Sequence, residues 1–113
     1  MKQPDLQALI WDALDASRKA REFAGERTFE EFEASAVTVA AVERMLEIIG
    51  EALRQAELAD ASIASNISNF RAIVGFRNRL AHGYFDIDAG RLWQIVRTNL
   101  PTLEHELDSL LPR

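Results

Sequence analysis

The stretch TFEEFEASAVTVAAVERMLEIIGEAL, from Thr28 to Leu53, carries a long helical pattern. It opens with Thr28-Phe29-Glu30-Glu31, a capping box in which the threonine hydroxyl and the glutamate carboxylate satisfy free amide groups at a helix start. Apolar side chains then recur at helical spacing along one stripe, namely Phe29, Phe32, Ala36, Val39, Leu46, Ile49 and Leu53. The pattern predicts one long helix from Phe29 to about Leu58, with Gly50 allowing a neighbouring helix to approach closely.

Helical patterns flank this stretch on both sides. The apolar stripe before it consists of Leu6, Leu9, Ile10, Ala13, Leu14, Ala20 and Phe23, and Gly25 should end that helix. Residues 59–68 are small and polar, which indicates a loop with room for one helical turn. A third helix should follow Ser68, a candidate cap, and place Phe70, Ile73, Val74, Phe76, Leu80 and Ala81 inward. It should stop near His82, because Gly83 suits the left-handed residue after a helix.

A last helix is predicted after Asp86 or Asp88, either of which can cap it. Its stripe is Leu92, Ile95, Val96, Leu100, Leu103, Leu107 and Leu110, and Pro101 should kink or break it. Four amphipathic helices with short connections indicate an all-α, up-and-down bundle of four to five helices. We expect a single domain over residues 1–113.

Composition narrows the class of protein. The chain has 113 residues, of which 48% are hydrophobic and 27% charged, as in ordinary globular domains. It has no cysteine, which excludes disulfides and thiolate-bound metal and fits a reducing cytoplasm. The N-terminal segment lacks the pattern of a signal peptide, and no apolar run is long enough for a membrane span. We expect a cytoplasmic protein that does not contact the membrane.

Charge is unevenly distributed along the chain. The net charge is −5, yet residues 66–100 hold five arginines against two aspartates and are therefore +3. Those arginines are Arg71, Arg77, Arg79, Arg91 and Arg97. A guanidinium fork matches the oxygens of a phosphate, so a local arginine excess on an acidic body suits recognition of a few phosphates rather than coating of a long duplex.

The segment RNRLAHGY, from Arg77 to Tyr84, gathers two guanidiniums, an amide, an imidazole and a phenol. Asn78 and His82 are four residues apart and share one helix face, whereas Arg77 and His82 lie about 140° apart around an ideal helix. They converge more easily if the helix unwinds at Gly83 or if two copies of the segment face each other across a two-fold axis.

These side chains suit cleavage of RNA without a metal. The reaction needs a base for the 2′-hydroxyl proton, an acid for the leaving 5′-oxygen and cations for the charge on phosphorus. Histidine can supply both proton transfers near neutral pH. A symmetric dimer would provide two copies of His82, one as base and one as acid, with Arg77 binding the phosphate.

Structural roles compete with each of these functional ones. His82 could instead cap the helix end, and Arg77 could pair with Glu43 or Glu47 on the long helix. Arg79, Arg91 and Arg97 suit surface or partner contacts better than catalysis, Trp11 and Trp93 suit packing, and His105 should face solvent. Glu43, Glu47 and Glu51 fit a solvated or arginine-paired face better than a metal site, because no second histidine lies at ligand spacing. We expect neither metal nor cofactor.

The motif resembles the signature of HepT-like proteins in the HEPN superfamily: arginine, four residues, histidine, any residue, tyrosine. The similarity extends to EIIGEA at 47–52, YFDID at 84–88, Leu92-Trp93 and Leu100-Pro101. In the family a proline-rich run ending in tryptophan stands where this chain has Asn69-Phe70. The resemblance covers most of residues 29–110.

The resemblance implies an all-helical, dimeric toxin of a type VII-like HepT/MntA toxin–antitoxin system that cleaves RNA without metal. Arg77 and His82 would be catalytic and Asn78 orienting, while Arg71 and Arg79 would contact RNA or a partner. The partner would be an MntA-like nucleotidyltransferase antitoxin, which in the family inactivates the toxin by adenylylating the tyrosine that corresponds to Tyr84. Adenylate there would add bulk and negative charge where an RNA phosphate must bind.

Two other functions stay open from the sequence. The chain could be a noncatalytic module that presents nucleotide or substrate to a separate minimal nucleotidyltransferase, with the same motif used for recognition. It could also be a helical interaction protein whose motif has lost its chemistry. RNA cleavage by the wild type and by variants at His82 and Arg77 tests the enzyme against both alternatives. The noncatalytic module predicts a tight complex without cleavage or growth arrest, and toxicity retained by His82→Ala would favour the interaction protein.

Overall fold

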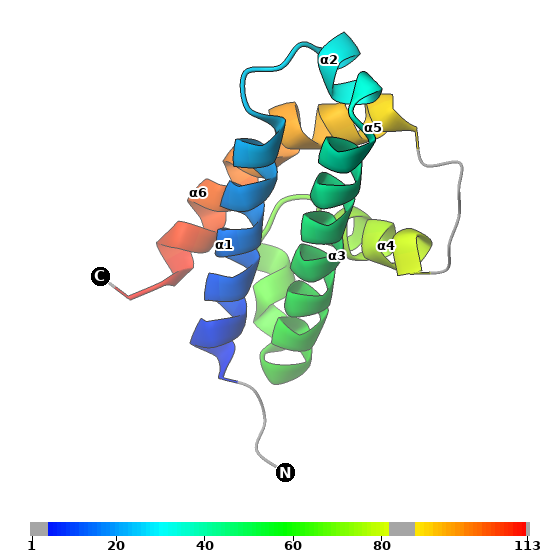
Figure 1. Cartoon of the computed structure of the whole chain (residues 1–113). Helices are drawn as coiled ribbons and strands as arrows, with labels where there is room; N and C mark the ends of the chain where they lie inside the picture. The colour runs from blue at the N-terminus through cyan, green and yellow to red at the C-terminus, as the bar shows by residue number, and fades with distance from the viewer. Residues whose placement is uncertain (1–4, 82–87, 113) are drawn as a thin grey trace.

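The computed structural model describes residues 5–81 and 88–112, and over residues 77–81 it describes the backbone alone. Every regular element in these ranges is helical, which confirms the all-α class. Helices α1 (Leu6–Ala24) and α3 (Ala36–Ala59) run side by side in opposite directions and form the centre of the fold (Figure 1). Helix α6 (Leu100–Leu110) packs on α1, and α4 (Phe70–Ala81) packs on α3. None of the described helices is long and apolar enough to cross a bilayer.

The predicted second helix is in fact two helices. The capping box forms as expected, with the Glu31 N–H donating to the Thr28 hydroxyl at 3.2 Å and the Thr28 N–H donating to the Glu31 carboxylate at 2.9 Å. Helix α2 (Phe29–Ala34) then ends at Ser35, whose backbone is extended. The Ser35 hydroxyl accepts from the Thr38 N–H and starts α3. The prediction of one continuous helix was wrong because serine competes for backbone amides as a cap, whatever the apolar spacing around it.

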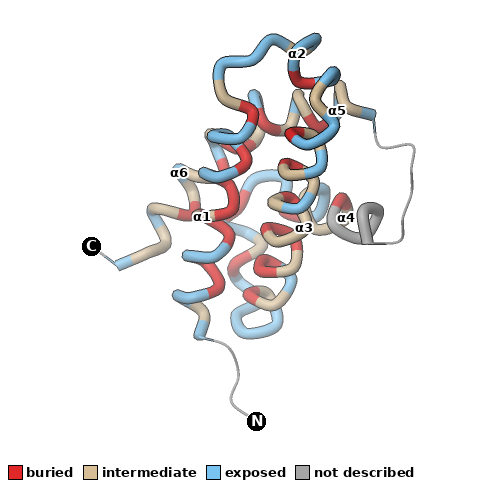
Figure 2. The backbone as a smooth tube through the Cα atoms, in the orientation of Figure 1, coloured by how far each residue is buried: buried red, intermediate tan, exposed pale blue. Residues whose placement is uncertain are grey.

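The core lies between α1, α3 and α6 (Figure 2). Leu14, Ile49, Leu53 and Leu107 are completely buried there. Helix α1 contributes mainly small buried side chains, namely Ala13, Ala16, Ser17, Ala20 and Ala24, so its neighbours can pack close to its backbone. The predicted stripe of α1 is therefore confirmed except at Phe23, which is 38% exposed.

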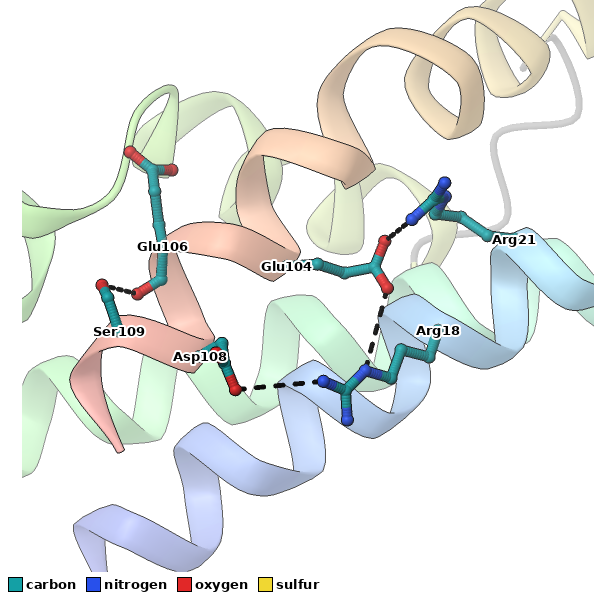
Figure 3. A network of polar contacts seen from close by, with 6 residues as sticks. All are labelled: Arg18, Arg21, Glu104, Glu106, Asp108 and Ser109. Carbon is teal, nitrogen blue, oxygen red and sulfur yellow. Dashed lines mark hydrogen bonds and ion pairs between the residues drawn. The ribbon is translucent and has the colours of Figure 1, made fainter. Parts of the chain in front are cut away.

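Ion pairs along the outer edge also join α6 to α1 (Figure 3). The Glu104 carboxylate accepts a hydrogen bond from Arg21 and lies 3.9 Å from the Arg18 Nε. Arg18 also reaches Asp108 at 3.9 Å. Because the Glu104 side chain is only 14% exposed, solvent screens these pairs less than it screens a fully exposed pair.

The C-terminal run stays helical through Pro101 but is distorted just before this residue, where a kink or break was predicted. Asp88 caps α5 (Ala89–Gln94) by accepting from the Gly90 N–H at 3.0 Å. A π-helical segment, Ile95–Asn99, follows and leads into α6, with Pro101 in the first turn of α6. Proline has no backbone N–H and cannot donate an α-helical hydrogen bond. The wider π-helical turn before Pro101 accommodates this missing bond.

Arg97 in the π-helical segment joins the C-terminal helical run to the segment that follows α1. Its guanidinium donates to the carbonyls of Gly25 at 2.7 Å and Arg27 at 3.1 Å, beyond the end of α1. It also stacks 4.1 Å from the centre of the Trp93 ring, which packs against Phe32. Arg97 thus has an intramolecular role, whereas the sequence suggested a surface or partner contact.

Candidate functional site at the end of helix α4

The start of α4 is fixed by the last helix of the fold. After the short 3-10 helix Ala61–Asn66, which confirms the predicted helical turn, the Ser68 N–H and hydroxyl donate to the Glu106 carboxylate on α6 at 2.8 to 3.1 Å. Ser68 is therefore tied to α6 and does not cap α4. Asn69 adopts a left-handed conformation, φ 60°, that turns the chain into the helix. The Asn69 carbonyl accepts the first helical bond, from the Ile73 N–H at 3.0 Å.

Helix α4 lies across α3, and its C-terminal end points away from the α1 and α3 pair (Figure 1). Phe70 and Phe76 are buried against the core, and Ile73 and Val74 are half-buried, as the apolar pattern predicted. The apolar face holds α4 in place.

The predicted site residues divide at the end of this helix. Arg77, Asn78 and Arg79 belong to the last described turns of α4. His82 and Tyr84 lie outside the described residues. The helix is described to Ala81, next to the end predicted near His82. Convergence of Arg77 with His82 stays a prediction.

Arg71, predicted to contact RNA or a partner, has an intramolecular acid. Its guanidinium binds the Glu57 carboxylate on α3 with two hydrogen bonds, one of them 2.8 Å long. The hydrogen bond to Glu57 raises the pKa of Arg71 above its ordinary value. The side chain is still 73% exposed and lies 5.2 Å from the centre of the Phe70 ring. Arg71 therefore helps to hold α4 on α3 while its outer face meets solvent.

Glu43, Glu47 and Glu51 form an acidic row on α3, and two of these three carboxylates pair with arginines of the same helix. Arg44 pairs with Glu47 at 2.9 Å and Arg54 with Glu51 at 2.7 Å, which confirms the expected arginine-paired face at these positions. Burial, and next the charge of Glu47, raise the pKa of Glu43 above its ordinary value. Within residues 5–81 and 88–112, no group of three histidine, aspartate or glutamate side chains could hold a metal ion.

A pocket of about 230 Å³ opens between α4 and the C-terminal helices. Its floor is apolar. Among the described residues its polar lining comes from four side chains that the sequence did not group together, namely Asn69, Arg91, Gln94 and Asn99. The pocket reaches Phe76, the residue before Arg77. The one sequence signal for this pocket is that Gln94 and Asn99 stand between apolar positions. Many helices have polar residues at such positions, so this signal does not predict a pocket.

The fold and the site define an all-helical protein with an arginine-bearing helix end suited to phosphate chemistry. A family model described as Ribonuclease HepT-like matches residues 13–110, which include the whole motif. The chain therefore belongs to the HepT-like ribonuclease family, as the resemblance of its motif indicated.

Named relatives agree with the family. The protein named "Putative RNase MJ1380" from Methanocaldococcus jannaschii is 34% identical over 108 residues, which are 96% of this chain and 98% of the relative. The protein named "Probable ribonuclease HepT" from Thermococcus cleftensis is 33% identical over 99 residues, 88% of this chain and 89% of the relative. No solved structure matches the chain.

Proposed function

We propose that this chain is the toxin of a type VII-like HepT/MntA toxin–antitoxin system, a cytoplasmic, single-domain endoribonuclease over residues 1–113 that cuts RNA without a metal. The observation that carries the proposal is the HepT-like match across residues 13–110, together with Arg77 and Asn78 in the last turns of α4.

The reaction is a transesterification at phosphorus. One His82 imidazole removes the proton of the RNA 2′-hydroxyl, and the 2′-oxygen attacks the adjacent phosphorus. A second, protonated His82 gives its proton to the leaving 5′-oxygen, so the products are a cyclic 2′,3′-phosphate and a free 5′-hydroxyl. Arg77 neutralises the charge that builds on the phosphoryl oxygens, and Asn78 orients the imidazole.

Two histidines require two protomers, because each chain has one His82 in the motif. His105 is the second histidine of the chain, but it is exposed on α6, as predicted, and the motif begins on α4. A homodimer that places two α4 ends across its two-fold axis would complete the site.

Neutralisation of the toxin would act on Tyr84. An MntA-like nucleotidyltransferase would let the Tyr84 oxygen attack the α-phosphorus of a nucleoside triphosphate, with loss of the phenolic proton and release of pyrophosphate. The resulting adenylate would repel and exclude the RNA phosphate. Tyr84 is the single tyrosine of the chain, so modification of a tyrosine identifies it without ambiguity.

RNA cleavage in the presence of a chelator tests the catalytic proposal. We expect the wild type to cleave and His82→Ala and Arg77→Ala to be inactive. His105→Ala and Arg54→Ala are matched controls on the exposed surfaces of α6 and α3, and both should retain activity. Equal cleavage by all five proteins would refute the proposal, whereas nucleotide binding without any cleavage would favour the noncatalytic role beside a nucleotidyltransferase.

Co-expression with a nucleotidyltransferase encoded beside this chain tests the switch. Mass spectrometry should find adenylate on the peptide that contains Tyr84, together with loss of RNA cleavage. Tyr84→Phe should stay unmodified and escape inhibition by adenylylation. An inhibited protein without adenylate would overturn the proposed mechanism of neutralisation.

A further inference from the structure

The pocket beside α4 has the lining of a site for a planar polar ring. Its floor is formed by Leu46 of α3, Ile73 and Phe76 of α4 and Ile95 and Leu100 of the C-terminal run. Leu46, Phe76 and Leu100 are buried in the core, so this floor is fixed by the packing of the fold. A volume of about 230 Å³ is below the roughly 300–1,000 Å³ of pockets for drug-sized ligands and suits a smaller group.

The rim of the pocket supplies hydrogen-bonding side chains of two kinds. Asn69, Gln94 and Asn99 bring side-chain amides, and Arg91 brings a guanidinium. Among the hydrogen bonds and ion pairs between described residues, none involves these four side chains. Arg97, two residues before Asn99, is by contrast held by two carbonyls and a tryptophan ring. The rim of the pocket is thus left available to bind a ligand.

We infer that this pocket binds a purine base of the RNA substrate, with Gln94, Asn99 and Arg91 reading its edge. Amide side chains pair with two adjacent polar atoms of adenine, and a guanidinium pairs in the same way with guanine. Bases of single-stranded RNA are recognised through such edge contacts together with packing on their faces, which Ile73 and Phe76 would supply. Arg91 at the rim supplies a positive charge, which favours a phosphate of the RNA backbone next to the pocket.

The place of the pocket relates it to the proposed reaction. Phe76 lines the pocket and Ala81 ends the described part of α4, so the helix advances about 7 Å between them. Phe76 directly precedes Arg77, the first residue of the motif, so the pocket and the start of the motif share one helix. This inference rests on the proposed function, and it makes the pocket the part of the chain that selects which nucleotide lies beside the cleaved bond.

Nuclear magnetic resonance of the full chain carrying His82→Ala tests base binding without any cleavage. The probes are the four nucleoside monophosphates, and the signals are the side-chain amides of Asn69, Gln94 and Asn99. We expect AMP and GMP to shift them more strongly than CMP and UMP do. The side-chain amide of Asn66, which donates to the Ser62 carbonyl at 3.1 Å, is the internal reference and should not move.

Substitutions in the pocket give the matched comparison. The double variant Gln94→Ala, Asn99→Ala should weaken purine binding about fivefold or more. Ala72→Trp should abolish it, because Ala72 is an exposed lining residue and an indole there would fill the pocket. Gln7→Ala removes an exposed amide from α1 and should change nothing.

Equal shifts from all four nucleotides or from inorganic phosphate, or no shift at all, would overturn the inference. So would full binding by the double variant, which keeps the test valid if Ala72→Trp fails to fold. Failure of RNA cleavage by the wild type would refute the proposed function and leave base binding measurable. Cleavage without purine binding would refute the pocket and leave the proposed function intact.

Discussion

The two sides of α3 differ in how they are packed. Toward α1 the side chains interlock tightly, and Leu14, Ile49 and Leu53 have no exposed surface. Toward α4 the contact is looser, because Ile73 and Val74 are half-buried and a pocket remains beside Phe76. One helix thus joins a stable core to a more open region that carries the motif. The difference separates a densely packed side of the fold from the side that carries the candidate motif.

The largest expected effect is a difference in the free energy of unfolding between core substitutions on the two sides of α3. Leu53→Ala leaves a cavity in the dense side and should lower the free energy of unfolding by about 2–5 kcal/mol. Ile73→Ala, at the wall of an existing pocket, should cost about 1 kcal/mol, because the lost contacts are fewer. Urea unfolding followed by circular dichroism measures both. Equal losses would mean that the two sides are packed alike.

A buried hydroxyl offers a second test of the dense side. Ser17 is completely buried in α1, and its Oγ has no hydrogen-bond partner among the described residues. Ser17→Ala should raise the free energy of unfolding by about 1 kcal/mol, since it removes an unsatisfied polar group without opening a cavity. The control is Ser109→Ala, which removes an exposed hydroxyl bonded to the Glu106 carbonyl and should slightly destabilise. Destabilisation by Ser17→Ala would show that this hydroxyl is paired.

The smallest expected effect concerns the acidic row of α3. Burial raises the pKa of Glu43, so the folded state holds its proton more tightly than the unfolded state does. Stability should therefore fall as the pH rises from the ordinary value of 4.5 through the raised pKa. Glu43→Gln should unfold at higher urea than the wild type at pH 7, and this advantage should vanish below pH 4.5.

The control for this effect is Glu33→Gln, at an exposed position of α2, which should leave the pH profile unchanged. An advantage of Glu43→Gln that persists at acidic pH would contradict the role of burial.

Local signals in the sequence predicted much of the fold. The cap at Thr28, the end of α1 at Gly25, the cap at Asp88 and the helix distortion near Pro101 depend on residues close in sequence, and the structure has all four. The break at Ser35 was missed because the apolar stripe continues across it. A serine favours a cap or a helix interior according to its tertiary surroundings, which periodicity does not reveal.

The candidate site was predictable only where it depends on residues close in sequence. The position of Arg77 on a helix end follows from Gly83 and the apolar pattern of α4. The pairing of Arg71 with Glu57 and the role of Arg97 at Gly25 join residues far apart in sequence, and no local pattern encodes them. The pocket was missed because its walls come from three separate segments of the chain.

The separation of stability from function is tested most directly by two measurements on one variant, His82→Ala. RNA cleavage should fall by more than about 10²- to 10⁴-fold, the usual contribution of one positioned acid or base, because the variant dimer loses both imidazoles. The free energy of unfolding should stay within about 0.5 kcal/mol of the wild type, because the core between α1, α3 and α6 is unchanged. Undiminished cleavage, or cleavage lost only together with the fold, would contradict a catalytic motif carried by an independent scaffold.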